Sequence, residues 1–269
     1  MTELLLEGRG IYKRYGHIRA LSNANFGVRA GEVVALVGDN GAGKSTLVKC
    51  LSGAMQPDAG EILIEGQATK LDSPLHARQL GVETVYQDLA LAPDLTAAQN
   101  LFLGREIIRS GILGLCGVVD RPSMRAKADT ALRNLGVGVQ DSSVAVGSLS
   151  GGQRQGVAIA RLVTWATKVV FMDEPTAALG VTQRERVHGA IRGLRDRGLG
   201  VVLISHNLPE VLAVADRLDV MRLGQRVAQF EANNVALEQV VAAMTGAMEQ
   251  QFDDAPGVGG KASGSGALN

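Results

Sequence analysis

The chain has 269 residues, of which 46% are hydrophobic and 20% are charged, a composition that fits a globular protein with one large domain or two small ones. Its 27 basic and 27 acidic residues cancel, which argues against non-specific binding to nucleic acid. Two cysteines are too few for a disulfide framework, and no apolar stretch approaches the about 20 residues that cross a bilayer. Because Glu3 and Glu7 interrupt the N-terminal apolar residues, we also expect no signal peptide.

The N-terminal part of the chain reads as a small antiparallel sheet. Short strand-like runs alternate with glycine turns over residues 3–29, and a further run, Glu61–Ile64, follows another turn. The N-terminal runs are Leu4–Leu6, Ile18–Ala20 and Ala24–Val28. Between them and residue 61, the apolar and β-branched run Glu32–Val37 is typical of a buried strand.

A glycine-rich segment follows that buried strand and fits the pattern G-x-x-x-x-G-K-[ST]. It consists of Gly38, Asp39, Asn40, Gly41, Ala42, Gly43, Lys44, Ser45 and Thr46. Apolar residues then recur at helical spacing, so the segment joins a strand to a helix, a context that favours a phosphate site over a glycine turn without a ligand. Backbone N–H groups and the helix N-terminus would attract phosphate oxygens, Lys44 would supply a charge to the β- and γ-phosphates, and the Ser45 hydroxyl can bind Mg²⁺.

The composition changes after the next predicted strand, Gly81–Tyr86. From about residue 89 to residue 165, helix-forming residues dominate and strand signals are weak. A helix is expected over Asp120–Leu135, with Pro122 in its first turn. We predict a helical subdomain at about residues 89–165, inserted into an α/β core.

A second potential anion site opens a helix in this region, where Leu149–Gln153 reads Leu-Ser-Gly-Gly-Gln. The hydroxyl of Ser150 and the free backbone N–H groups of Gly151, Gly152 and Gln153 would lie at a helix N-terminus, which favours an anion. The simpler interpretation is an ordinary serine-capped helix.

Two adjacent carboxylates, Asp173 and Glu174, end the apolar strand Val169–Met172. A carboxylate at the carboxyl end of a parallel strand beside the phosphate loop can hold Mg²⁺ through water, and we assign this role to Asp173. Since side chains alternate along a strand, Glu174 points elsewhere and could orient or deprotonate a water in line with the γ-phosphate. The alternative is a strand that merely ends in a surface turn, but the phosphate loop upstream favours the catalytic interpretation.

Strands and helices alternate again beyond this point. The expected elements are a helix at Gln183–Arg197, a strand at Val201–Ile204, a helix at 208–215, strands at 218–222 and 226–230, and a helix at 235–244. Residues 1–246 would form one domain, and the Gly-, Ala- and Ser-rich residues 247–269 a disordered tail. The pattern predicts an α/β fold with a mostly parallel core sheet and an N-terminal antiparallel β subdomain.

The motifs and their order resemble the ATP-binding cassette (ABC) ATPases, which are P-loop NTPases. The phosphate loop comes first, then Leu149–Gln153, then Asp173 and Glu174, and finally His206 after an apolar strand. The pairing of a phosphate loop with Leu-Ser-Gly-Gly-Gln is highly specific to that superfamily, and the resemblance covers residues 15 to 206, with the fold pattern extending to about residue 245. Three segments are most similar to monosaccharide-import cassettes of ribose, xylose and fructose type: Val85–Asp88, Glu174–Gly180 and Ile204–Asn207.

The resemblance implies further site residues. Tyr15 matches the aromatic residue that stacks on adenine, with a half-buried strand tyrosine as the alternative interpretation. Gln87 matches the glutamine that contacts Mg²⁺ and the attacking water, and His206 matches the histidine that contacts the γ-phosphate. The implied cofactors are ATP and Mg²⁺, with Glu174, His206 and Gln87 as catalytic residues and Ser45, Gln87 and Asp173 at the metal.

The resemblance also implies an assembly. In the family, the Leu-Ser-Gly-Gly-Gln element meets the γ-phosphate held by an opposite chain, so two copies of this chain would sandwich two ATP molecules. Transmembrane permease subunits would dock near residues 88–105 and a substrate-binding protein would act through them, which places the chain in the cytoplasm, peripheral on the inner face of the cell membrane. No nucleic acid partner is expected. Where the family usually has an aspartate this chain has Gly180, a departure that concerns the coupling of the two ATP sites rather than ATP binding.

We therefore expect an ATP-hydrolysing subunit that energises monosaccharide import through a membrane permease. One alternative is a soluble ABC ATPase without a transport role, against which the single cassette and the neutral charge argue. The other is an ATP-gated assembly adaptor with little hydrolysis, against which the intact Glu174 and His206 argue.

Overall fold

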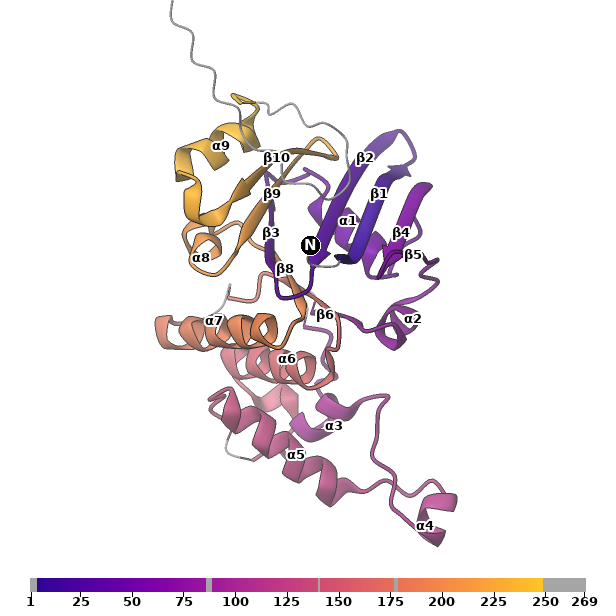
Figure 1. Cartoon of the computed structure of the whole chain (residues 1–269). Helices are drawn as coiled ribbons and strands as arrows, with labels where there is room; N and C mark the ends of the chain where they lie inside the picture. Colours follow the sequence, from indigo (N-terminus) through magenta and orange to yellow (C-terminus); the bar gives the residue numbers. More distant parts are fainter. Residues whose placement is uncertain (1–3, 86–88, 140, 177–178, 249–269) are drawn as a thin grey trace, which may run out of the picture.

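The computed structural model describes residues 4–85, 89–139, 141–176 and 179–248, and two β-sheets form their framework (Figure 1). The first sheet has the strand order β2-β1-β4-β5, and its pairs are antiparallel. Its strands are β1 (Leu4–Tyr15), β2 (Ile18–Arg29), β4 (Ala59–Ile64) and β5 (Gln67–Ala68). The predicted N-terminal antiparallel sheet is confirmed, with the predicted run at residues 61–64 as one of its strands.

The second sheet has six strands in the order β10-β9-β3-β8-β7-β6 and is parallel except for its last strand, β10, which pairs antiparallel with β9. Its strands are β3 (Val33–Gly38), β6 (Val82–Val85), β7 (Val169–Asp173), β8 (Gly200–Ile204), β9 (Arg217–Arg222) and β10 (Gln225–Glu231). The predicted mostly parallel α/β core is therefore confirmed. Because the carboxyl ends of parallel strands meet at one edge, this topology brings Gly38, Asp173 and Ile204 to the same edge of the sheet.

Helices cover both faces of the parallel sheet. They are α1 (Lys44–Leu51), α2 (Pro74–Gln79), α7 (Val181–Asp196), α8 (Leu208–Leu212), α9 (Leu237–Thr245) and the short 3₁₀ helix η2 (Ala232–Asn234). Alternate residues of β3 lie in two different cores. Val34 and Leu36 pack with the antiparallel sheet, α1 and α2, whereas Val33, Ala35 and Val37 face the core that α7, α8 and α9 share. Burial on both faces explains why β3 is continuously apolar.

A helical region is inserted between β6 and β7 and lies beneath the two sheets in Figure 1. It contains α3 (Ala97–Phe102), α4 (Ile112–Leu115), α5 (Arg121–Asn134), the 3₁₀ helix η1 (Val146–Ser148) and α6 (Gly151–Trp165). Helix α6 joins this region to the core, because Ala158 and Leu162 pack in the core beneath the parallel sheet while Val157 and Ala160 pack with α3 and α5.

Three local differences from the sequence expectations have physical causes. Strands β1 and β2 are 12 residues long, not short runs, because bulges between Gly8 and Ile11 and between Lys13 and Arg14 interrupt the alternation that marks a strand. Helix α8 ends at Leu212, short of residue 215. Helix α2 was not expected, although Ser73 caps it and Pro74 opens it. Of the predicted tail, residues 249–269 lie outside the described part of the chain.

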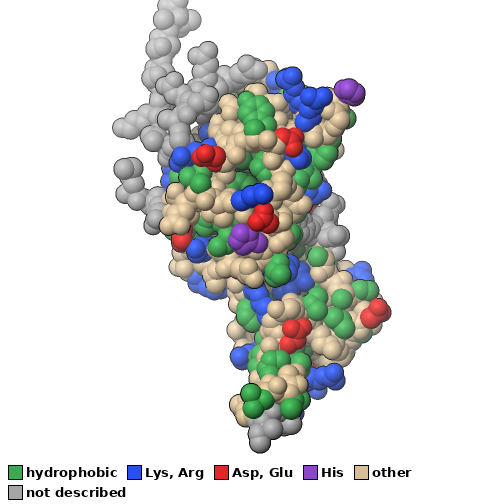
Figure 2. Space-filling model, turned by 90° about the vertical axis from the view of Figure 1, so that its right-hand side faces the viewer, with side chains coloured by type: hydrophobic (Ala, Val, Ile, Leu, Met, Phe, Trp, Pro, Cys, Tyr) green, Lys and Arg blue, Asp and Glu red, His purple; other side chains and the backbone are tan. Residues whose placement is uncertain are grey.

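None of the helices in the described ranges combines the length and the apolar character that crossing a membrane requires. On the face seen in Figure 2, Lys and Arg side chains lie among Asp and Glu side chains, in keeping with the equal numbers of basic and acidic residues in the sequence.

Candidate functional site

The phosphate loop connects β3 to α1, and two of its glycines are required by the packing around it. Gly38 has φ 150°, and a Cβ there would overlap the carbonyl oxygen of Met221. Gly43, the residue before α1, has φ 103°, and a Cβ there would lie 2.7 Å from the carbonyl oxygen of Ala20. The loop is thus held between β9 and β2, with its backbone close to both.

Lys44 folds back over this loop. Its Nζ donates to the carbonyl oxygens of Gly38 at 2.7 Å and Asp39 at 2.9 Å, and burial lowers the pKa of Lys44. The exposed Ser45 hydroxyl lies next to it, and no acidic side chain stands in the first turn of α1. The helix N-terminus, the lysine and the open loop together suit an anion.

Asp173 and Glu174 lie at the same edge, at the end of β7 and next to β8. Burial raises the pKa of the Asp173 carboxyl and the neighbouring Glu174 raises it further, while Lys44 and Lys49 oppose the shift. Two motifs that are far apart in the sequence, the phosphate loop and this acidic pair, are therefore close enough to interact electrostatically. Burial disfavours the ionised form of the Asp173 carboxyl, and a bound cation would stabilise that form.

Glu174 has an unusual backbone conformation, and both oxygens of its carboxylate accept hydrogen bonds. Its φ is 50°, and its backbone N–H donates to the carbonyl oxygen of Ile204 at 2.8 Å. His206 Nδ1 lies 2.7 Å from Glu174 Oε1, the backbone N–H of His206 donates to the same oxygen at 3.0 Å, and Ser205 Oγ donates to Oε2 at 3.3 Å. The Glu174 side chain is 15% exposed and the His206 side chain 79%, so the imidazole covers the carboxylate and presents its other edge to solvent.

Two residues in this arrangement were missed by the sequence analysis. Ser205 directly precedes His206, and its position at the end of an apolar strand was the one available signal. Gln155 lies in α6, where its buried Nε2 donates to the carbonyl oxygen of Glu174 at 3.3 Å and to that of Pro175. Nothing in the sequence indicates the contacts of Gln155, because they depend on how α6 packs beneath the sheet.

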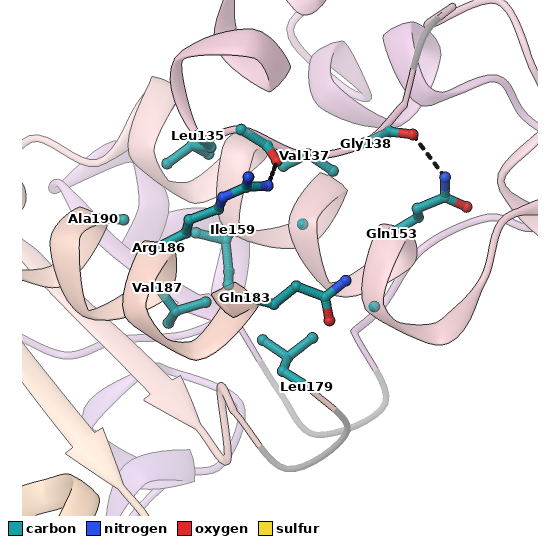
Figure 3. Close-up of a pocket in the computed structure, with 13 residues that line it drawn as sticks. Leu135, Val137, Gly138, Gln153, Ile159, Leu179, Gln183, Arg186, Val187 and Ala190 are labelled. Carbon is teal, nitrogen blue, oxygen red and sulfur yellow. Dashed lines mark hydrogen bonds between the residues drawn. The ribbon is translucent and has the colours of Figure 1, made fainter. Parts of the chain in front are cut away.

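Ser150 caps the N-terminus of α6, as in the simpler of the two interpretations of the sequence, and the cap is reciprocal. The backbone N–H of Gln153 donates to Ser150 Oγ at 3.3 Å, and Gln153 Oε1 accepts from the Ser150 N–H at 2.9 Å. Gln153 Nε2 also donates to the carbonyl oxygen of Gly138 at 2.8 Å (Figure 3). Gly151 remains exposed with open space beside its Cα, so this helix N-terminus is accessible.

An open crevice adjoins this helix start, between α6, α7 and the loop 135–138 (Figure 3). Within the ranges that the structure describes, no hydrogen bond or ion pair joins residues 150–153 to residues 38–46 of the same chain. The structure thus brings the phosphate loop, Asp173, Glu174 and His206 together and leaves the Ser150 helix start outside that group.

The remaining residues singled out in the sequence are Tyr15, Gln87 and Gly180. Tyr15 ends β1 with 44% of its surface exposed, and its hydroxyl is 2.8 Å from Met55 Sδ. Gln87 lies outside the described residues. Gly180 precedes α7 with φ −71° and open space around its Cα, so no steric demand of the backbone requires glycine there.

The oxygen donors at the edge of the sheet fit Mg²⁺. Magnesium takes few protein ligands, prefers carboxylate and hydroxyl oxygens, and completes its shell with water and phosphate. Ser45 Oγ and the Asp173 carboxylate offer that donor type, and no larger cluster of His, Cys, Asp or Glu occurs among the residues placed in the structure.

Comparison with known proteins supplies a context for this site. A family model described as "ABC transporter" matches residues 21–177. A fructose import ATP-binding protein of Rhizobium meliloti is 51% identical over 249 residues, which cover 92% of this chain and 96% of that protein. A xylose/arabinose import ATP-binding protein of Sulfolobus acidocaldarius is 42% identical over 241 residues, covering 90% and 94%. A ribose import ATP-binding protein of Rhizobium meliloti is 43% identical, and this chain spans 47% of its length.

Solved structures agree with the fold. A dimeric ATP-binding cassette in a post-hydrolysis state, bound to ADP and phosphate, superposes with a TM-score of 0.74 at 25% identity, covering 86% of this chain and all of that one. A nucleotide-free cassette from an ABC transporter superposes with a TM-score of 0.72 at 26% identity, covering 90% and 95%.

Proposed function

The chain belongs to the ABC transporter family of ATPases, and on that premise we propose that it is the ATP-hydrolysing subunit of a monosaccharide importer. The single observation that carries the proposal is the Glu174 carboxylate, held by His206 and Ser205 at the sheet edge that also bears the phosphate loop. The import of sugars rests on relatives named for fructose, xylose/arabinose and ribose import, which are 51%, 42% and 43% identical to this chain.

In this proposal each motif has one role toward ATP. The loop from Gly38 to Thr46 binds the phosphates through its backbone N–H groups, and Lys44 leaves its carbonyl partners to contact the β- and γ-phosphates. Tyr15 stacks on the adenine. Bound Mg²⁺, held by Ser45 and, through water, by Asp173, would neutralise charge on the β- and γ-phosphates.

Hydrolysis then depends on the Glu174 arrangement. Glu174 orients and deprotonates the water that attacks the γ-phosphorus, while the bond to the β-phosphate oxygen breaks and ADP leaves. The Nδ1–H of His206 orients the carboxylate, and the exposed edge of the ring contacts the γ-phosphate. Gln87 is proposed to contact the metal and the attacking water.

The position of Ser150 supports a composite site. Its helix start is exposed and makes no polar contact with the phosphate loop of its own chain within the described residues, although a helix N-terminus suits the γ-phosphate. A dimeric cassette is among the similar solved structures. We assign the Leu-Ser-Gly-Gly-Gln element to the ATP held by a second copy of the chain, so that ATP closes the dimer and hydrolysis reopens it.

The relatives named for sugar import support a proposal for the partners. A membrane permease docks near residues 88–105 and responds to the opening and closing of the dimer. A substrate-binding protein delivers the sugar to the permease. The chain works at the cytoplasmic face of the cell membrane.

Uptake in cells tests the proposal. Deleting the gene should abolish energy-dependent uptake of one radiolabelled monosaccharide among fructose, xylose, arabinose and ribose. The wild-type gene should restore that uptake, and a Glu174→Gln gene expressed at the same level should not. Unchanged uptake of all four sugars in the deletion strain would reject monosaccharide import by this chain.

A further inference from the structure

Glu210, in α8, accepts hydrogen bonds from two side chains that follow Glu174 in the sequence. Thr176 Oγ1 donates to Glu210 Oε2 at 2.5 Å, and Arg184 Nη1 donates to Oε1 at 2.7 Å. Arg184 Nε in turn donates to the carbonyl oxygen of Leu179 at 3.0 Å. One carboxylate therefore fixes both Thr176 and Leu179, directly and through Arg184.

The same glutamate is tied to the loop that carries His206. The backbone N–H of Glu210 donates to Asn207 Oδ1 at 3.5 Å, the cap of α8. The backbone N–H of Asn207 donates to Ser205 Oγ at 3.1 Å, and that hydroxyl donates to Glu174 at 3.3 Å. The contacts form a closed ring that runs from Glu174 along the backbone to Thr176, across to Glu210, and back through residues 207 and 205.

The ring is largely buried, which increases the contribution of each hydrogen bond to the stability of the arrangement. Thr176 is 8% and Ser205 6% exposed, and the Glu210 side chain 16%. Apolar side chains line the space beside them, among them Leu203 and Val211. In such surroundings a hydrogen bond is stronger than in water, and removing one partner leaves the other unsatisfied.

We propose that Glu210 is a positioning residue for ATP hydrolysis, which holds the loop of Glu174 and the loop of His206 in one arrangement so that they move together. The inference rests on the proposed ATPase function and adds a residue outside the known motifs. Through Arg184 and Leu179 the carboxylate also reaches the start of α7, whose Gln183 lines the crevice beside Gln153 (Figure 3). Binding or loss of the γ-phosphate at Glu174 and His206 would thereby change the structure near the Ser150 helix start.

Four variants separate this role from a general contribution to stability. Glu210→Gln keeps the shape of the side chain, but the amide N–H₂ group cannot accept a hydrogen bond from Thr176 or Arg184. Thr176→Val removes the hydroxyl at constant volume, and Thr176→Ser restores it. Glu65→Gln is the matched control, because it removes a 2.6 Å ion pair to Lys168 that lies at the surface, away from the ring.

Steady-state ATP hydrolysis by the purified chain gives the first readout. We expect kcat to fall about tenfold or more in Glu210→Gln and Thr176→Val with KM for ATP within about twofold of wild type, because positioning acts on the transition state more than on ATP binding. Thr176→Ser and Glu65→Gln should retain the wild-type kcat. An unchanged kcat in Glu210→Gln, or a loss in Thr176→Ser equal to that in Thr176→Val, overturns the proposal.

Amide hydrogen exchange of the free chain gives a readout that does not require turnover. In Glu210→Gln, exchange should rise together in the peptide with Thr176 and in the peptide with Ser205, and neither should change in Glu65→Gln. A rise in only one of the two peptides overturns the ring. If the wild-type chain neither binds nor hydrolyses ATP, the proposed function fails, while the exchange result still decides whether Glu210 joins the two loops.

Discussion

His206 Nδ1 lies 2.7 Å from Glu174 Oε1, and the backbone N–H of His206 donates to the same oxygen at 3.0 Å. The two residues are 32 positions apart and meet because β7 and β8 are adjacent parallel strands that end at the same edge. Because one carboxylate oxygen accepts hydrogen bonds from two groups of the same neighbour, the carboxylate keeps its orientation when water enters the site, as the proposed general base must.

Replacing Glu174 by glutamine tests the assignment of the base. Hydrolysis should fall at least about 100-fold because the amide cannot take a proton, whereas ATP affinity should stay within about threefold because the phosphate loop is untouched. Hydrolysis assays and titration calorimetry measure the two quantities, with Glu231→Gln at an exposed position as the control. Undiminished turnover would remove Glu174 from this role.

Lys44→Ala should lower ATP affinity about 100-fold, because the ammonium group is the positive side chain that we assign to the β- and γ-phosphates. Calorimetry on the free chain measures this loss. Lys70→Ala removes a lysine whose side chain is 77% exposed and should leave the affinity unchanged. Equal ATP affinity in Lys44→Ala and wild type would contradict the assignment of the phosphate loop.

Asp173→Asn should have opposite effects on the unfolding temperature with and without Mg²⁺ and ATP. Burial raises the pKa of Asp173 above its ordinary 3.8, so the folded chain binds this proton more tightly than the unfolded chain, and above the raised pKa the ionised carboxylate destabilises the fold. The variant without nucleotide should therefore unfold about 2 °C higher at neutral pH, and the difference should shrink as pH falls through the window between the raised pKa and 3.8.

With Mg²⁺ and ATP present the order should reverse, because the asparagine lacks the charge that we assign to the metal. Calorimetric unfolding scans over a pH series, in EDTA and in Mg²⁺–ATP, measure both effects. Asp72→Asn at the surface serves as the control. Equal stabilisation of Asp173→Asn and wild type by Mg²⁺–ATP would place the metal elsewhere.

The two cysteines should react very differently with an alkylating reagent. Cys50 is fully buried in α1, and burial raises the pKa of its thiol to about 11, whereas Cys116 is exposed. Mass spectrometry after iodoacetamide treatment of the native chain at pH 8 should find Cys116 modified and Cys50 intact. Modification of both at equal rates would show that α1 opens readily, contrary to the packing described.

The sequence could predict those parts of the site that local pattern determines. The phosphate loop is specified by glycines whose positive φ and close neighbours exclude other residues, and β7 is specified by an apolar run that ends in two carboxylates. The order of the strands places both at one edge. The reciprocal cap of Ser150 and Gln153 likewise follows from a spacing of three residues.

Contacts between distant segments could not be predicted in this way. Gln155 reaches the carbonyl oxygen of Glu174 only because α6 packs beneath the sheet, and Glu210 meets Thr176 across a gap of 34 residues. Bulges hid the full length of β1, because the register shifts break its alternation. Such features depend on tertiary packing, on which a single sequence carries little information.

We propose that each ATP lies between the phosphate loop of one chain and the Ser150 helix start of another. Two inactive variants test it when mixed. Lys44→Ala disables the phosphate loop, and Gly151→Asp places a negative charge at the helix start, where there is room for the side chain and the helix tolerates it. Mixed dimers would contain one fully intact site, because each chain supplies the part that the other lacks.

Hydrolysis by the equimolar mixture, compared with each variant alone, is therefore the most direct measurement. With half of the dimers mixed and one of two sites intact in each, activity should recover to as much as about a quarter of the wild-type rate. A mixture no more active than the sum of the two variants would contradict the shared site.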